Sequence, residues 1–366
     1  MQLIKRLLLI VIPGVLFNAW PAAAQQLYFP PADGQWETVD PAAVGWDPAR
    51  LAAALELAGP RQSSGVLILH GGRILAERYW SMADAPNGYA NFVTGHDAAG
   101  RVIEDVASAQ KSVVAVLTGI AQERGLLNID EAVSRYLGQG WSKTEINNEQ
   151  QITIRHLLSM TSGLKEDLSF DAAPGSKWFY NTPAYHMVMR VVTAAAGSDR
   201  DTITRDWLTG KLGMRDSSWT ARPWASADIA VGFSTTARDL ARFGLMIQAG
   251  GKWGNEAVLA DQDYLQAMLT PSQSLNPAYG FLWWLNGQSY SLAPGARVPR
   301  IEGPLITSAP ADLVTMQGAA DRKLYLVPSL NLVVTRLGFS GELDGESFNK
   351  AFWTALSAAA PAASAR

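Results

Sequence analysis

Hydrophobic and polar residues follow two different spacings along this chain, and the change between them divides it into parts. After Asp47-Pro48, a pair typical of a helix start, apolar residues recur at helical spacing up to Gly59. Two apolar runs, at 65–70 and 73–80, then lie on either side of Gly71-Gly72. This arrangement predicts a helix followed by a β-hairpin.

Helical spacing dominates the middle of the chain, where capping residues precede apolar runs and glycines follow several of them. We expect helices at 108–124, 131–137, 154–160, 203–212, 237–249 and 261–269, and another that ends at Gly197. From Tyr279 onward aromatic and β-branched runs return. They predict strands at 280–286, 323–329 and 330–338, before a last helix at 347–359.

Strands at both ends with helices between them predict an α/β lobe built from both termini, into which a helical lobe is inserted. The expected parts are an N-terminal arm with the first part of the α/β lobe at 25–106, a mainly helical lobe at 107–278, the second part of the α/β lobe at 279–357 and a disordered tail at 358–366. With 366 residues, 48% of them hydrophobic, the chain is long enough for two lobes that share an interface.

The N-terminus has the pattern of a secretory signal peptide. Lys5 and Arg6 precede an apolar stretch, and small residues that end at Ala24 supply a cleavage site. The apolar stretch is short for a membrane span, and Pro13 interrupts it. We therefore expect residues 1–24 to be removed after Ala24, a secreted or periplasmic mature protein and no membrane span in it.

Composition excludes several classes of function. The net charge of -3 comes from 30 basic and 33 acidic residues mixed along the chain, so nothing favours binding to nucleic acid. Cysteine is absent, which excludes thiol catalysis and thiolate metal sites. The chain has no Gly-rich phosphate loop and no G-x-S-x-G, and its four histidines are scattered at positions 70, 96, 156 and 186. We expect neither a metal nor a cofactor.

The strongest chemical signal is Ser108 followed by Lys111 at the start of an apolar helix. Residues three apart lie on one helix face, so an amine there can help to remove the serine proton. The same S-x-x-K spacing also occurs from Ser162 and from Ser347. The first of these is followed by Gly163 and is interpreted as a turn, whereas the second begins the terminal helix.

Six segments place the Ser108 motif in a wider context: 108–137, 152–164, 174–188, 234–253, 279–286 and 324–338. Their sequences and order resemble the class C β-lactamase-like serine hydrolases, and most of all the esterases and 6-aminohexanoate-dimer amidases of that family. The resemblance covers about 44–353. It implies a β-lactamase/transpeptidase-like fold, with an antiparallel sheet flanked by helices.

The resemblance also assigns catalytic roles. Ser108 matches the family nucleophile, Lys111 its lysine partner and Tyr180 the tyrosine of the second catalytic element. Lysine and tyrosine ordinarily have pKa values near 10, and lowering one of them to about 7 corresponds to roughly 4 kcal/mol. We expect Tyr180 to relay the proton to the leaving group while Lys111 holds Ser108 and favours the tyrosinate. The identity of the base stays open between the two, because coupled groups titrate as a pair.

Two departures from the family pattern bear on substrate binding. Relatives commonly have Tyr-x-Asn, whereas Tyr180 is followed by Asn181 and Thr182, both of which we keep as candidate substrate contacts. The third element, Lys-Thr-Gly or His-x-Gly in relatives, aligns with 319–321 when counted back from Pro328.

That third alignment contains no lysine or histidine. It makes Ala320 and Asp321 candidate substrate contacts, and it assigns the backbone N–H of Arg322 as the second oxyanion donor beside that of Ser108. Asp321 either faces a cationic or polar group of the substrate or pairs with Arg322 or Lys323 at a strand end.

The sequence thus predicts an exported serine hydrolase that cleaves a small-molecule ester or non-lactam amide through an acyl-enzyme at Ser108. Two alternatives remain. One is a β-lactamase or D-Ala-D-Ala peptidase, which the missing third-element cation disfavours. The other is a non-catalytic binding protein on the same fold, which the presence of both Lys111 and Tyr180 disfavours. The oligomeric state is left open.

Overall fold

The computed structural model describes residues 27–226, 229–295 and 297–361. The predicted signal peptide at 1–24 therefore lies outside the described residues. Within these ranges no helix has the length and apolar character needed to cross a membrane.

A six-stranded antiparallel sheet forms the centre of one lobe. Its order is β2-β1-β14-β13-β12-β9, in which the strands are β1 (Ser63–His70), β2 (Arg73–Tyr79), β9 (Trp284–Leu285), β12 (Val314–Gly318), β13 (Arg322–Val327) and β14 (Leu332–Gly338). Strands from the two ends of the chain meet where β1 pairs with β14. The prediction of an antiparallel sheet assembled from both termini is confirmed.

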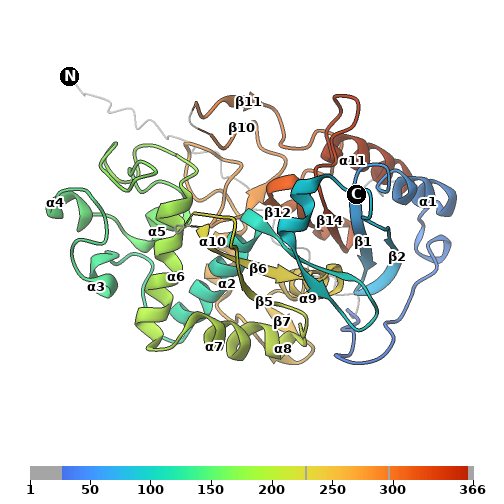
Figure 1. Ribbon diagram of the computed structural model, residues 1–366, viewed down its shortest axis with the longest axis horizontal. Helices are drawn as coiled ribbons and strands as arrows, with labels where there is room; N and C mark the ends of the chain where they lie inside the picture. The colour runs from blue at the N-terminus through green and yellow to red at the C-terminus, as the bar shows by residue number, and fades with distance from the viewer. Residues whose placement is uncertain (1–26, 227–228, 296, 362–366) are drawn as a thin grey trace, which may run out of the picture.

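Helices cover both faces of this sheet (Figure 1). Val66 and Ile68 on β1 pack in a core with α1 (Pro48–Glu56) and α11 (Phe348–Ala359). Leu67 and Leu69 belong to the other core, which contains α9 (Ala237–Gln248). The two-residue period of a strand thus directs alternate side chains into two hydrophobic layers.

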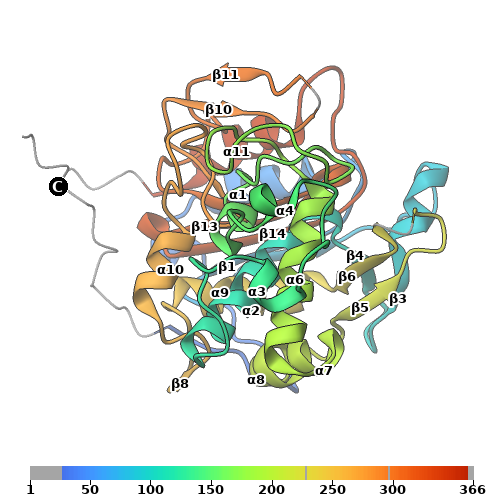
Figure 2. The ribbon, with the colours of Figure 1, turned by 90° about the vertical axis from the view of Figure 1, so that its left-hand side faces the viewer.

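The second lobe is mainly helical and is built around α2 (Gln110–Glu123). Every residue of α2 from Gln110 to Ala121 is buried, as the apolar run predicts. Figure 2, seen from the helical side, shows α3 (Ser134–Leu137) and α6 (Thr182–Ala196) in front of α2. This packing places the first turn of α2 at the boundary with the main sheet.

A small four-stranded sheet was not predicted. Its order is β3-β4-β6-β5, from β3 (Val93–His96), β4 (Val102–Asp105), β5 (Ser218–Ala221) and β6 (Val231–Thr235). These strands are short, and β3 and β5 contain no buried residue, so they carry little apolar periodicity. Strand β4 leads directly into the turn that holds Ser108.

The remaining elements are short or peripheral. They are η1 (Ala42–Val44), η2 (Asn87–Phe92), η3 (Ala107–Ala109), α4 (Ile146–Glu149), α5 (Ile154–Leu158), α7 (Arg200–Thr204), η4 (Arg205–Thr209), α8 (Gly210–Leu212), β7 (Lys252–Trp253), β8 (Glu256–Ala257), α10 (Gln262–Met268), the hairpin β10 (Tyr290–Leu292) and β11 (Arg300–Glu302), η6 (Ala319–Asp321) and η7 (Pro328–Leu330). The predicted tail at 358–366 begins too early, because α11 continues to Ala359; residues 362–366 are not described.

Candidate active site

Ser108 lies in η3, a single tight turn between β4 and α2. The preceding Ala107 has a φ of +50°, a left-handed conformation that is costly for a residue with a side chain. Its N–H donates to Oδ1 of Asp105 at 2.8 Å, and the same carboxylate pairs with the buried guanidinium of Arg222. A buried ion pair therefore fixes the backbone that presents Ser108.

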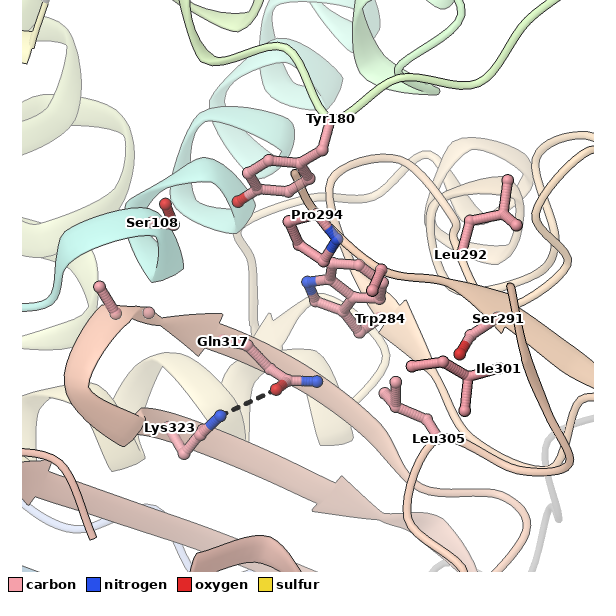
Figure 3. Close-up of a pocket in the computed structure, with 13 residues that line it drawn as sticks. Ser108, Tyr180, Trp284, Ser291, Leu292, Pro294, Ile301, Leu305, Gln317 and Lys323 are labelled. Carbon is pink, nitrogen blue, oxygen red and sulfur yellow. Dashed lines mark hydrogen bonds between the residues drawn. The ribbon is translucent and has the colours of Figure 1, made fainter. Parts of the chain in front are cut away.

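Ser108 contacts both predicted partners. Nζ of Lys111 lies 3.1 Å from its Oγ, and the hydroxyl of Tyr180 lies close enough to Ser108 for the serine to affect the pKa of the tyrosine. The lysine comes from the next helical turn, whereas the tyrosine comes from the loop before α6. Figure 3 shows the Tyr180 hydroxyl directed at Ser108.

The environment shifts the pKa values of the two candidate bases, Lys111 and Tyr180, in opposite directions. Burial, followed by the charge of Arg222, lowers the pKa of Lys111 to about 7. Burial raises the pKa of Tyr180 to about 12, although the nearby Ser108 hydroxyl acts in the opposite direction. Near neutral pH a neutral amine is thus accessible, while the phenol keeps its proton.

Aromatic rings enclose the Lys111 amine. Nζ lies 4.8 Å from the ring centroid of Tyr180 and 4.7 Å from that of Tyr185. Ring faces attract cations, so the two rings favour the charged form of the amine, whereas its burial favours the neutral form.

Two cavities meet at Ser108. One, of about 340 Å³, is mainly apolar: Trp284, Leu292, Pro294, Ile301 and Leu305 form much of its wall, with Gln317 and Lys323 on one side (Figure 3). The other, of about 710 Å³, is more polar, and its lining includes Lys111, Glu166, Asp167, Thr182, His186 and Arg222. Because Ser108 lines both cavities, a molecule bound across them would have its middle part beside the serine hydroxyl.

The strand beside Ser108 is β12, and the predicted position of the third element is wrong. Ala319 lines both cavities, and Gln317 and Gly318 line the apolar one. A Cβ on Gly318 would lie 2.1 Å from the carbonyl oxygen of Val106, so only glycine allows this approach. The element is therefore Met316-Gln317-Gly318, in which buried Met316 takes the place of the lysine or histidine of relatives.

Residues 319–321 form the turn after β12 rather than a strand, and Ala320 and Asp321 both have positive φ. Counting back from Pro328 missed this turn, because it placed the strand that lines the site at 319–321. Arg322 opens β13 and pairs with Gly318 across the hairpin. It lines neither cavity at Ser108, so the backbone amide beside the serine is that of Ala319, not that of Arg322.

The other candidate contacts have structural partners. Asp321 accepts from the N–H of Gly341 at 2.9 Å and lies 3.4 Å from Nζ of Lys323, the pairing that was the alternative to a substrate contact. Asn181 caps α6 and donates to the carbonyls of residues 164 and 165, so its polar atoms do not face substrate. Thr182 does line the polar cavity.

The two other S-x-x-K matches are structural. Ser162 accepts from the N–H of Leu164 in a turn, and Ser347 caps α11 through the N–H of Lys350. No group of three or more metal-ligating side chains occurs in the described part of the chain.

Sequence reasoning missed Lys323, which donates to Oε1 of Gln317 at 2.8 Å beside the apolar cavity. Burial lowers its pKa. Only the pairing of β12 with β13 brings these two side chains together, and a two-residue period in 314–318 was the one local signal of the strand.

Comparison with known proteins agrees with this geometry. The sequence model of the Beta-lactamase family matches residues 49–344. The fold is similar to a putative beta-lactamase from Bacteroides dorei, at 18% identity and a TM-score of 0.64 over 86% of this chain and 99% of that one.

It is also similar to a putative 6-aminohexanoate-dimer hydrolase from Bacillus anthracis, at 14% identity and a TM-score of 0.57 over 83% of this chain and 82% of that one. EstCE1, a hydrolase with promiscuous acyltransferase activity, matches at 16% identity and a TM-score of 0.56 over 84% of this chain and 97% of that one. The chain therefore belongs to the Beta-lactamase family, a family of serine hydrolases that share this fold.

Proposed function

We propose that this protein hydrolyses an ester or a non-lactam amide through an acyl-enzyme on Ser108. The observation that carries the proposal is that the Lys111 amine, 3.1 Å from Oγ of Ser108, and the Tyr180 hydroxyl are both directed at one serine where two cavities meet. A binding protein has no need of such a proton-transfer group.

In the proposed mechanism neutral Lys111 accepts the Ser108 proton as Oγ attacks the carbonyl carbon. The N–H groups of Ser108 and Ala319 hold the oxyanion. Tyr180 then donates its proton to the leaving oxygen or nitrogen and recovers one from the Lys111 ammonium, whose charge the rings stabilise. Water then attacks the acyl carbon and passes a proton through the same pair to Oγ of Ser108 as the bond between the acyl carbon and Oγ breaks, which releases the acid and restores the serine. Lys111 is thus the base, and Tyr180 delivers the proton to the leaving group.

The cavity walls support the choice of substrate. The smaller cavity is walled mainly by apolar side chains, which suit an uncharged acyl chain. The third element has Met316 where a cation would bind the carboxylate of a β-lactam. Both features favour an ester or a linear amide.

One observation favours a β-lactam or peptide carboxylate instead, namely Lys323 beside the apolar cavity. Its charge is partly balanced by Asp321 at 3.4 Å, and its amine already donates to Gln317. This alternative therefore ranks second, and rapid turnover of a chromogenic cephalosporin would reverse the order.

A fluorophosphonate probe with peptide mapping tests the nucleophile. Labelling is expected at Ser108, but not at Ser162 or Ser347, and Ser108→Ala is expected to abolish both labelling and turnover. Labelling of another serine, or undiminished turnover in Ser108→Ala, would refute the proposal. A panel of acyl esters, linear amides and β-lactams then identifies the substrate class.

We also propose that the protein is exported and loses residues 1–24. N-terminal sequencing of the secreted or periplasmic protein is expected to begin at Gln25, and an intact Met1 in that fraction would contradict cleavage.

A further inference from the structure

The turn that presents Ala319 to Ser108 is held by two arginines whose side chains lie outside both cavities. Nη1 of Arg322 donates to the carbonyl of Ala319 at 3.1 Å. Nη1 of Arg336 donates to the carbonyls of Ala320 and Asp321, each at 3.1 Å. All three carbonyls of the turn thus accept from a guanidinium. Both arginines are completely buried.

This turn needs external support. Ala320 and Asp321 have φ values of +57° and +60°, which are costly for residues with side chains. No glycine relieves the strain, so contacts from outside the turn have to maintain the conformation. Each guanidinium donates along fixed directions in one plane, which suits it to fixing carbonyl positions.

The first arginine also connects the turn with the strand that carries the nucleophile. Nε of Arg322 lies 3.4 Å from the carboxylate of Glu104. Glu104 is the β4 residue next to Asp105, whose carboxylate fixes the turn of Ser108. Glu104 also accepts from the N–H of Gly338 and the hydroxyl of Tyr89. One buried ion pair therefore links the two backbone segments that supply the oxyanion donors.

A gain in folding stability alone does not explain why Arg322 is buried at this turn. Nε and Nη2 of Arg322 have no hydrogen-bond partner among the described residues, although the side chain is fully buried. Phe92 covers the guanidinium at 3.8 Å and separates it from the polar cavity. A buried charge with unsatisfied donors costs stability, and apolar replacements of buried ion pairs are often neutral or stabilising.

We propose that Arg322 and Arg336 are positioning residues, which clamp the carbonyls of 319–321 and thereby hold the Ala319 amide at the oxyanion beside Ser108. The inference rests on the proposed function. Arg322 thus acts through its side chain on the neighbouring peptide rather than through its own N–H.

The test compares Arg322→Lys with Arg242→Lys. Arg242 is a buried arginine that also donates to backbone carbonyls, those of Pro30 and Leu212, but away from the Ser108 cavities. Both variants are measured for melting temperature, for fluorophosphonate-labelled sites, for kcat and KM on an activated ester, and for the affinity of a trifluoromethyl ketone that mimics the tetrahedral intermediate.

For Arg322→Lys we expect kcat per labelled site to fall roughly 10- to 100-fold with little change in KM, because a displaced oxyanion donor weakens binding of the transition state alone. Ketone affinity is expected to fall by a similar factor, while the pH midpoint of the rate stays unchanged. Arg242→Lys is expected to lower the melting temperature without lowering kcat per labelled site.

If Arg322→Lys does not fold, the double variant Glu104→Gln/Arg322→Met removes the buried charge pair together and is expected to show the same kinetic loss. Unchanged kcat per site and ketone affinity, or an equal loss in Arg242→Lys, would reduce the arginines to a structural role. Absence of label at Ser108 in the wild-type protein would overturn the proposed function itself, and the oxyanion role of the clamp with it.

Discussion

The pH dependence of catalysis follows from the burial of Lys111. Burial and the charge of Arg222 lower the pKa of this amine from 10.5 to about 7. A shift of that size corresponds to ~5 kcal/mol of differential interaction between the charged and neutral forms. In the proposed mechanism only the neutral amine accepts the Ser108 proton, so kcat/KM is expected to rise with pH through about 7 and then level off.

The fall in kcat/KM at low pH is set by the fraction of Lys111 that is neutral. Two pH units below the pKa of Lys111, the neutral fraction is ~1%, so kcat/KM at pH 5 is expected near ~1% of its plateau. Tyr180 has its pKa raised to about 12 and keeps its proton across the measurable range. No falling limb is therefore expected below pH 10.

The assay is kcat/KM for a short-chain p-nitrophenyl ester between pH 5 and 9.5, with tryptophan fluorescence as a check that the protein stays folded. Lys111→Met is expected to lose activity at every pH. Lys350→Met is the matched control, because Lys350 has the same spacing from Ser347 but is 69% exposed. It is expected to keep the wild-type profile.

A rising limb centred above pH 9 would refute the reasoning, since it would mean that Lys111 remains charged at neutral pH or that Tyr180 is the base. A flat profile from pH 5 to 9.5 would also contradict it, as would a Lys111→Met variant that retained the wild-type midpoint.

Three further predictions test other parts of the site. Tyr180→Phe is expected to lower kcat ~10²–10⁴-fold for alkyl esters but much less for p-nitrophenyl esters, whose leaving group needs no proton; equal losses for both would exclude the assigned role. Gly318→Ala is expected to lower both activity and melting temperature, because its Cβ would meet the Val106 carbonyl at 2.1 Å, whereas Gly95→Ala, with its nearest neighbour at 3.7 Å, is expected to be mild. Leu305→Trp is expected to narrow the apolar cavity and lower the kcat/KM ratio of octanoyl to acetyl esters ~10-fold or more, and an unchanged ratio would place the acyl chain elsewhere.

The parts of the site that depend on local geometry were predictable. A three-residue spacing on a helix brings Ser108 and Lys111 together whatever surrounds them, and the structure has their side chains 3.1 Å apart. Caps at Asp47, Thr153 and Thr236 likewise begin helices where the sequence predicts them. In each case the residues that interact are neighbours in the chain.

The third element shows where local reasoning failed. The strand 314–318 is short, and the turn after it has positive φ at Ala320 and Asp321 without any glycine, so Asp321 was the one turn-type residue within 319–321. Counting back from Pro328 therefore ended in the turn and missed Gly318. The small four-stranded sheet went unnoticed for a related reason, because its strands are short and two of them, 93–96 and 218–221, contain no buried residue.

The sequence by itself determined a sheet built from both ends of the chain, and it predicted Ser108 as the nucleophile among three S-x-x-K matches. Only the tertiary structure decided that Ala319 is the amide beside Ser108, that Lys323 reaches the apolar cavity and that burial lowers the pKa of Lys111 while it raises that of Tyr180. The oxyanion site joins segments some 210 positions apart in the sequence, and a strand register is set by pairing across the sheet. The pKa of Lys111 is likewise set by the burial and charge that several elements impose together.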